Sequence, residues 1–203
     1  MPDSTAPAGQ GPRTRVRPYR YEDADEFAAL ARDSRALHHP WLFPPLTPEA
    51  YRDYASGVIE DPTKAGFLVC ELTDGDMTDG GPAGGGRIAG FININNIVRG
   101  GFLSGALGYG AFAHAAGRGL MGEGLRHVMR HAFGPLGLHR LEANIQPTNT
   151  ASIALVRGAG FRHEGYSPDF LRIDGHWRDH ERWAITADMV RDTAAGGLSD
   201  PSG

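Results

Sequence analysis

The sequence contains a single cysteine, Cys70, in 203 residues. One cysteine excludes an internal disulfide and a thiolate-rich metal site, and it fits a reducing compartment such as the cytoplasm. Long apolar runs are also lacking, and the first residues, MPDSTAPAGQGP, have neither the basic start nor the apolar middle of a signal peptide. We therefore expect a cytoplasmic protein with no membrane contact.

An excess of positive charge is lacking as well. The chain has 20 Lys and Arg against 24 Asp and Glu, a formal net charge of -4, so its charge gives no reason to expect direct nucleic-acid binding. The length favours one domain over a nucleotide domain joined to a separate substrate domain. Both a monomer and a homodimer are compatible with the sequence.

Small and polar residues mark the expected domain boundaries. Residues 1–12 and 191–203 are rich in Pro, Gly, Ser, Asp and Ala, and we predict that both are disordered tails. Between them lies a single predicted domain, residues 13–190. Its acidic, glycine-rich segment 73–87 is predicted to be a flexible loop between two strands.

The apolar periodicity inside this domain predicts the element order βααβββαβαββ, an α+β or mixed α/β layered fold. Asp23 with Glu26 indicates the cap of the first helix, and Thr47 before Pro48 indicates the cap of the second. The expected helices are 25–37, one that starts near residue 48, 119–133 and 148–160. The expected strand segments are 14–19, 66–72, 87–97, 102–112, 138–145, 161–167, 170–173 and 176–186, with a turn at Asp174 and Gly175 before the last.

Residues 117–122 form the string G-x-G-x-x-G, which is the pattern of a dinucleotide-binding loop, and Glu142 follows the last glycine by twenty positions. A dehydrogenase loop turns directly off its strand, however, and here four residues separate Phe112 from Gly117. We therefore reject a dehydrogenase. Glycines at 117 and 119 still allow backbone N–H groups at a helix start to approach a pyrophosphate, and the alternative is an ordinary glycine-rich helix start.

Several motifs beyond this loop point to a family. His114-x-x-Gly117-x-Gly119 follows a predicted strand, and the chain continues with Asn149-x-x-Ser152, Gly160-Phe161 and Glu164-Gly165. These motifs resemble the acetyl-CoA loop and the N-x-x-S, GF and EG run of the GNAT superfamily of N-acetyltransferases. The segments NIVRG, LGYG, GRGLM, LHRLEAN and IDGHWRDH, and the stretch His38 to Trp41, are similar to ribosomal-protein-alanine N-acetyltransferases of the RimJ and RimL type.

The resemblance implies a central mixed, mostly antiparallel sheet with helices on both faces and with its fourth and fifth strands splayed apart. It also implies acetyl-CoA as acyl donor. Gly108 and Gly110 would form a bulge in the fourth strand and leave backbone groups of the next residues free for the pantetheine arm and the thioester carbonyl. The implied coenzyme-binding residues are Ala111, Phe112, His114, Ala115, Ala116, Gly117, Arg118, Gly119, Leu120, Asn149, Ser152 and Arg157.

Some of these positions have alternative interpretations. Arg118 and Arg157 are either phosphate partners or solvated surface arginines. Asn149 is expected to cap its helix as well as to bond the pantetheine arm. His114 stands where the family usually has Gln or Arg, a departure that could weaken phosphate binding or make it pH-dependent.

The resemblance also implies catalytic roles. Glu142 is the expected general base, acting through water, and the alternative is a strand carboxylate paired with Arg140. Val156 stands where many relatives have a tyrosine acid, so Ser152 is the expected proton donor to the thiolate, with helix capping as the alternative. Buried Cys70 is expected to be inert, which favours direct transfer in a ternary complex.

No metal is expected. His176 and His180 share one face of a strand, but no third ligand with metal-site spacing accompanies them. Six aromatic side chains are candidates for the wall of an acceptor cleft, although aromatic residues more often belong to the core. They are Trp41, Tyr109, Tyr166 and Trp177, together with Phe43 and Phe170.

The acceptor is expected to be a primary amine. A protein α-amino group has a pKa near 8 and lysine one near 10.4, so the neutral nucleophile costs about 3 kcal/mol less to form from an α-amine at equal pH. A protein N-terminus, with a ribosomal protein as the family's example, is therefore the favoured acceptor. A lysine, an antibiotic or metabolite amine, and a non-catalytic acyl-CoA-binding module remain the alternatives.

Overall fold

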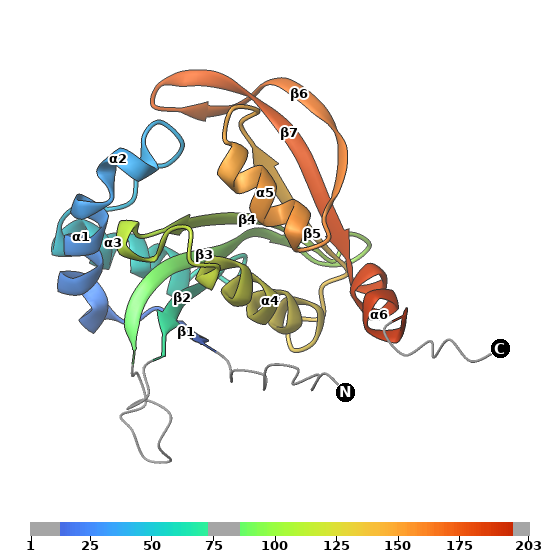
Figure 1. Ribbon diagram of the computed structural model, residues 1–203, viewed down its shortest axis with the longest axis horizontal. Helices are drawn as coiled ribbons and strands as arrows, with labels where there is room; N and C mark the ends of the chain where they lie inside the picture. Colours follow the sequence, from blue (N-terminus) through green and yellow to red (C-terminus); the bar gives the residue numbers. More distant parts are fainter. Residues whose placement is uncertain (1–12, 73–85, 197–203) are drawn as a thin grey trace, which may run out of the picture.

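The computed structural model describes residues 13–72 and 86–196, and in this part of the chain seven strands form one sheet (Figure 1). The strand order is β1-β2-β3-β4-β5-β7-β6. Neighbouring strands are antiparallel except β4 and β5, which are parallel. The strands are β1 (Thr14–Pro18), β2 (Ala65–Glu71), β3 (Arg87–Val98), β4 (Ser104–Ala111), β5 (Arg140–Ile145), β6 (Arg162–Ile173) and β7 (His176–Thr186). The expected mixed, mostly antiparallel sheet is thus confirmed.

Helices cover both faces of the sheet, as predicted, with α1 and α3 on one face and α4 and α5 on the other (Figure 1). The helices are α1 (Ala24–Asp33), α2 (Arg35–His38), α3 (Pro48–Ile59), α4 (Leu120–Phe133), α5 (Thr150–Gly158) and α6 (Ala187–Gly196), with single 3-10 turns η1 (Tyr21–Asp23) and η3 (Ala113–Ala115). No helix within the described ranges is both long and apolar enough to span a membrane.

Strand β2 shows how the sheet joins two cores. Successive side chains of a strand point to opposite faces. Phe67 and Val69 therefore pack in the core under α4, whereas Leu68 and Cys70 pack in the core under α1 and α3. Cys70 is buried, as expected, and burial raises the pKa of its thiol. The sheet is accordingly apolar on both sides at its centre.

Two of the three predicted helix caps are confirmed. The Thr47 hydroxyl accepts the N–H of Ala50 (3.2 Å) at the start of α3, where Pro48 takes the first helical position. The Asn149 side chain accepts the N–H of Ser152 (3.1 Å) at the start of α5. Both caps use groups within three residues of each other, which is why the sequence alone reveals them.

The cap predicted at Asp23 with Glu26 is wrong. Both carboxylate oxygens of Asp23 bind the guanidinium of Arg17 (2.6 and 2.8 Å), and the same carboxylate accepts the N–H of Arg20. Glu26 instead accepts the N–H of Ile88 on β3 (3.0 Å). Partners elsewhere in the fold therefore take up both carboxylates that the local pattern assigns to the helix start.

Other elements depart from the predicted boundaries. The segments 161–167 and 170–173 belong to one strand, β6, whose pairing with β7 is irregular between Ser167 and Leu171. The short helix α2 and the helix α6 were not predicted separately, and α6 continues past residue 190 to Gly196. The turn at Asp174 and Gly175 does join β6 to β7. The predictions for residues 1–12, 73–85 and 197–203 lie outside the described residues.

The splay of the fourth and fifth strands is confirmed. Strand β4 pairs with β5 from Ser104 to Leu107 and continues to Ala111 beside β3 alone. The bulge expected in β4 is wrong, because its pairing with β3 is regular from Ala106 to Ala111 and the irregularity lies in β3 between residues 95 and 98. Gly110 has a different role: a Cβ there would lie 2.9 Å from the ring of Phe91.

Candidate active site

A cavity of about 370 Å³ lies where β4 leaves β5. Four parts of the chain form its wall: α2 with the turn after it, the end of β4, the turn before α4 with its first helical turn, and the start of α5. Of the residues that the sequence assigns to the site, the cavity wall contains Trp41, Tyr109, Ala111, Ala115, Ala116, Gly117, Gly119, Asn149 and Ser152. The fold thus brings together segments more than a hundred residues apart.

The start of α4 presents backbone amides to this cavity. Gly117 and Gly119 both have positive φ (72° and 79°), a conformation that side-chain-bearing residues rarely adopt, and no side chain caps the helix. The N–H of Gly122 donates to the carbonyl of Gly119 (3.1 Å). The N–H groups of the residues just before Gly122 come ahead of the first hydrogen bonds of the helix and so have no partner within it. Such amides, at the positive end of a helix dipole, form a binding site for an anion.

The two arginines proposed as phosphate partners lie outside the cavity wall. Arg118 donates to Glu71 (Nη1 to Oε2, 2.8 Å), and this pairing lowers the pKa of Glu71. The guanidinium of Arg157 lies over the ring of Trp183, 5.5 Å from its centroid. Arg13, which the sequence does not indicate, donates to the carbonyl of Arg118 (3.3 Å). Backbone groups are therefore the principal donors on the cavity side of this turn.

Three more of the proposed coenzyme residues lie beside the cavity rather than in its wall. The side chains of Phe112 and Leu120 are buried in the two cores, so only their backbone could contact a ligand. His114 lies in η3, burial lowers its pKa, and its Nε2 has no hydrogen-bond partner. Because its Nε2 is buried and His114 is not part of the cavity wall, its side chain does not reach the place proposed for the phosphate.

The splayed edge of β4 offers fewer free groups than the sequence suggests. The N–H of Phe112 donates to the carbonyl of Ala89 (2.9 Å), and the carbonyl of Ala111 accepts from Nε2 of His38 (2.8 Å). Thus β3 and α2 already bond two of the backbone groups near Ala111 and Phe112. Since alternate residues of a strand direct their amides to opposite sides, the N–H groups of Tyr109 and Ala111 point toward the gap beside β5.

A pair of hydroxyl groups lies in the cavity wall. The phenol oxygen of Tyr109 is 2.6 Å from Oγ of Ser152, although 43 residues separate them in the sequence. Burial raises the pKa of Tyr109 to about 12, against the opposing effect of the Ser152 hydrogen bond. The phenol therefore stays protonated at neutral pH.

Glu142 lies outside this cavity. Its Oε1 accepts from Nε of Arg140 (2.7 Å), whose guanidinium also binds Glu164, and 40% of the Glu142 side chain is exposed. The pairing with Arg140 is the alternative that the sequence left open, and the structure contains it. Glu142 also points to the face of β5 opposite the apolar side chains Leu141 and Ala143, which pack under α4 and α5.

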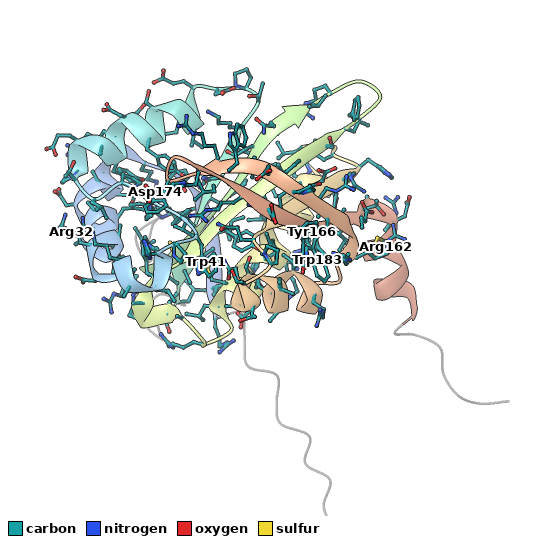
Figure 2. All side chains as sticks on the ribbon, turned by 90° about the horizontal axis from the view of Figure 1, so that it is seen from above. Arg32, Trp41, Arg162, Tyr166, Asp174 and Trp183 are labelled. Carbon is teal, nitrogen blue, oxygen red and sulfur yellow. The ribbon has the colours of Figure 1, made fainter. Side chains whose placement is uncertain are left out.

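Aromatic side chains proposed for the acceptor cleft are scattered. Trp41 lies in the cavity wall, whereas Tyr166 and Trp177 are more than half exposed and line none of the cavities described here. The Tyr166 hydroxyl donates to Asp179. Figure 2 shows the β6–β7 hairpin crossing the molecule from Arg162 toward the helices α1 to α3, where its turn at Asp174 lies.

A second cavity, of about 410 Å³, adjoins the first. It lies between α3 and the β3–β4 pair, and the two cavities share Leu42 and Tyr109. Asp53, Asn93 and Asn95 give it polar groups. The sequence contains no signal for this cavity, because its wall depends on how α3 packs across the sheet. Among the described residues, no group of three or more His, Cys, Asp or Glu could hold a metal ion.

These features define a class: a mixed α/β domain in which a helix start with free amides lies beside a gap in the sheet. The chain belongs to the acetyltransferase (GNAT) domain family, whose model matches residues 13–162. Over 100 residues it is 42% identical to the [ribosomal protein uS5]-alanine N-acetyltransferase of Escherichia coli (strain K12), a match that covers 49% of this chain and 52% of that protein. The chain spans about half the length of the curated relatives it matches.

Solved structures agree with this assignment. Mycobacterium smegmatis RimJ, in complex with CoA-disulfide, superposes with a TM-score of 0.75 at 28% identity, covering 90% of this chain and 89% of that one. The spermidine N-acetyltransferase of Vibrio cholerae, in complex with CoA and spermine, shares the fold with a TM-score of 0.70 at 17% identity, covering 87% of this chain and 97% of that one.

Proposed function

We propose that this chain transfers an acetyl group from acetyl-CoA to the α-amino group of a protein N-terminus, by direct attack in a ternary complex. The observation that carries the proposal is one cavity that joins the free amides of α4, the splayed edge of β4 and the hydroxyl of Ser152. The E. coli relative, which by its name acetylates an alanine of ribosomal protein uS5, supports a protein acceptor.

Coenzyme A fits the order of groups along this cavity. The amides of residues 117 to 121 would hold the pyrophosphate, and the pantetheine arm would run between β4 and α5. There the N–H of Ala111 would bond the arm or polarise the thioester carbonyl. Asn149 caps α5 with its side-chain oxygen, which leaves its amide nitrogen for the arm. Arg118 and Arg157 would contribute only if their present partners released them.

The second cavity suits the approach of the amine. It meets the first at Tyr109, so a nucleophile in it would face a thioester in the other. Asp53 provides a carboxylate for a protonated amine beside the cation of Lys64, and Asn95 provides an amide for a peptide backbone. The amide of Asn93, by contrast, is already bonded to Tyr19 and Tyr54. We retain Glu142 as the proposed base. It lines neither cavity, so the proton of the amine would have to reach it through water.

The acceptor is tested by mass spectrometry after incubation with acetyl-CoA. Three substrates separate the alternatives: a peptide with a free alanine N-terminus, the same peptide with a blocked N-terminus and an internal lysine, and spermidine. We expect one acetyl group on the free N-terminus alone, since an α-amine is more readily neutral at pH 7. Acetylation of only the lysine peptide or only spermidine would contradict the proposed acceptor.

Variants then separate an enzyme from a coenzyme-binding module. Glu142→Gln and Ser152→Ala should lower turnover by about 100-fold each, while calorimetry shows unchanged affinity for coenzyme A. A non-catalytic module would bind the coenzyme and turn over none of the amines. If Glu142→Gln keeps full turnover, the base is another group and the ion pair with Arg140 is structural.

A further inference from the structure

We propose that Tyr109 and Ser152 act as a two-hydroxyl relay that carries a proton to the sulfur of the leaving coenzyme. This inference rests on the proposed acetyl transfer and adds a second residue to its acid. The hydroxyl of Tyr109 comes from strand β4 and that of Ser152 from the first turn of α5, and 2.6 Å separates the two oxygens. Both residues belong to the wall of the coenzyme cavity.

The hydrogen-bond directions around Ser152 favour this role. Its N–H donates to the Asn149 cap, so its place at the helix start is fixed without its hydroxyl. A hydroxyl has one proton to donate and two lone pairs to accept with. If the phenol donates to Ser152, the serine proton is free to point into the cavity, where the sulfur would lie.

The position of Tyr109 favours the relay over a serine acting alone. A serine that protonates a thiolate becomes an alkoxide, which is a poor product unless another group protonates it at once. The phenol of Tyr109 is that group, because a tyrosine is already protonated at neutral pH at its ordinary pKa. Tyr109 also lines the second cavity, from which the amine would attack.

The proton transfers balance without any further reactant. The amine nitrogen attacks the thioester carbonyl carbon, and a C–N bond forms. As the C–S bond breaks and its electron pair goes to sulfur, Ser152 gives its proton to the thiolate and receives the phenol proton of Tyr109. Glu142 would remove, through water, the proton that the ammonium form loses before attack, and the phenolate of Tyr109 takes the proton that the nitrogen loses after attack, directly or through a water in the second cavity. The products are the amide and the free thiol, and both hydroxyl groups are restored.

Tyr109→Phe tests the relay because it removes one oxygen and keeps the ring that packs in the cavity wall. We expect kcat to fall by about 100-fold, while the KM and calorimetric Kd for the coenzyme stay unchanged. The Tyr109→Phe/Ser152→Ala double variant should be no slower than the slower single variant, because both changes remove the same relay. Ser152→Thr, which keeps a hydroxyl, should restore most of the activity lost in Ser152→Ala.

Tyr51→Phe is the matched control. Tyr51 is fully buried, its hydroxyl donates to the carbonyl of Arg20 (3.0 Å), and it does not line any of the described cavities. This variant should keep the wild-type kcat. Unchanged kcat in Tyr109→Phe, or additive losses in the double variant, would overturn the relay.

The two proposals fail in different ways. All variants are assayed with whichever amine the wild type acetylates, so acetylation of spermidine or lysine alone would overturn the α-amine proposal and still test the relay. A proportional loss of coenzyme affinity in Tyr109→Phe, with kcat unchanged, would show that the phenol only shapes the cavity. An absence of turnover in the wild type with every amine would overturn both proposals.

Discussion

At the scale of single residues, His38 connects α2 to the site. Its side chain is buried, its Nε2 donates to the carbonyl of Ala111, and its Nδ1 has no hydrogen-bond partner. Burial lowers the pKa of His38, and the bond to Ala111 opposes this effect only in part. The imidazole is therefore held neutral, with its one proton on Nε2.

This histidine should make the stability of the protein depend on pH. Because its pKa is lower in the folded state, the unfolded state binds a proton first as the pH falls below about 6.5. We expect the free energy of unfolding to decrease from pH 7 toward pH 5, with a contribution from His38 of at most about 1.4 kcal/mol per pH unit. The measurement is urea unfolding at a series of pH values.

The variant His38→Gln should show a shallower decrease over the same range, because its amide can still donate to the carbonyl of Ala111 and does not titrate. His176→Gln, at an exposed position on β7, serves as the control for the loss of a histidine. An identical pH dependence in the wild type and His38→Gln would contradict the prediction.

Individual hydrogen bonds and ion pairs of the site could be predicted from the sequence only where the two partners are close in the chain. The Asn149 cap and the pair of Arg140 with Glu142 each involve neighbours within three residues. The contact of Tyr109 with Ser152 depends on how β4 and α5 meet in space, and no local pattern reveals it. The same reason explains the false cap at Asp23, whose stronger partner is the guanidinium of Arg17 on the preceding strand.

At the scale of elements, helix α4 packs unusually close to the sheet at Gly124. A Cβ at this position would lie 2.6 Å from one methyl carbon of Val69 and 2.8 Å from the other. Val69 is fully buried on β2, and its branched side chain has little freedom to move. The lack of a side chain at Gly124 thus allows the helix that presents the proposed phosphate site to pack directly against β2.

Gly124→Ala should therefore destabilise the fold. We expect a loss of about 1–2 kcal/mol in the free energy of unfolding, since overpacking of about 1–3 kcal/mol exceeds the gain in helix propensity. Gly122→Ala, in the same helix with no atom closer than 3.9 Å to the added Cβ, should stabilise it by up to about 1 kcal/mol. Urea unfolding measures both, and equal effects would contradict the close contact.

Elements with strong local signals were predicted well from the sequence. The amphipathic pattern of α4 and the cap of α3 place those helices close to their observed bounds. The bulge in β4 was inferred from two glycines, but one of them makes room for the ring of Phe91 on the neighbouring strand. Glycine indicates close approach as readily as irregular backbone, and the sequence does not distinguish the two.

At the scale of the whole molecule, residues from α2, β4, α4 and α5 line the proposed coenzyme cavity, so a ligand in it should stabilise the entire fold. At a hundredfold excess over Kd, binding adds about 2.7 kcal/mol, which raises the melting temperature by about 5–10 °C in a domain of this size. We expect this rise with coenzyme A and no rise with NAD. An equal rise with NAD would return the glycine-rich loop to the dinucleotide-binding alternative.

The overall architecture followed from the sequence because its elements and motifs agree. Alternating strands with two buried faces, capped helices and a glycine-rich helix start all indicate the same layered domain. The second cavity did not follow, because it is formed by packing between α3 and the sheet rather than by a motif.

The gap beside β4 also bears on aggregation, because it leaves backbone amides of a strand unpaired. Unpaired strand amides invite association with another chain, and most proteins protect such edges at the rim of a sheet. Here the unpaired stretch of β4 lies at the centre, between β3 and β5, and residues from α2, α4 and α5 surround the cavity next to it. A foreign strand would have to displace residues of these helices to reach those amides, so the opening for the ligand does not act as an exposed edge of the sheet.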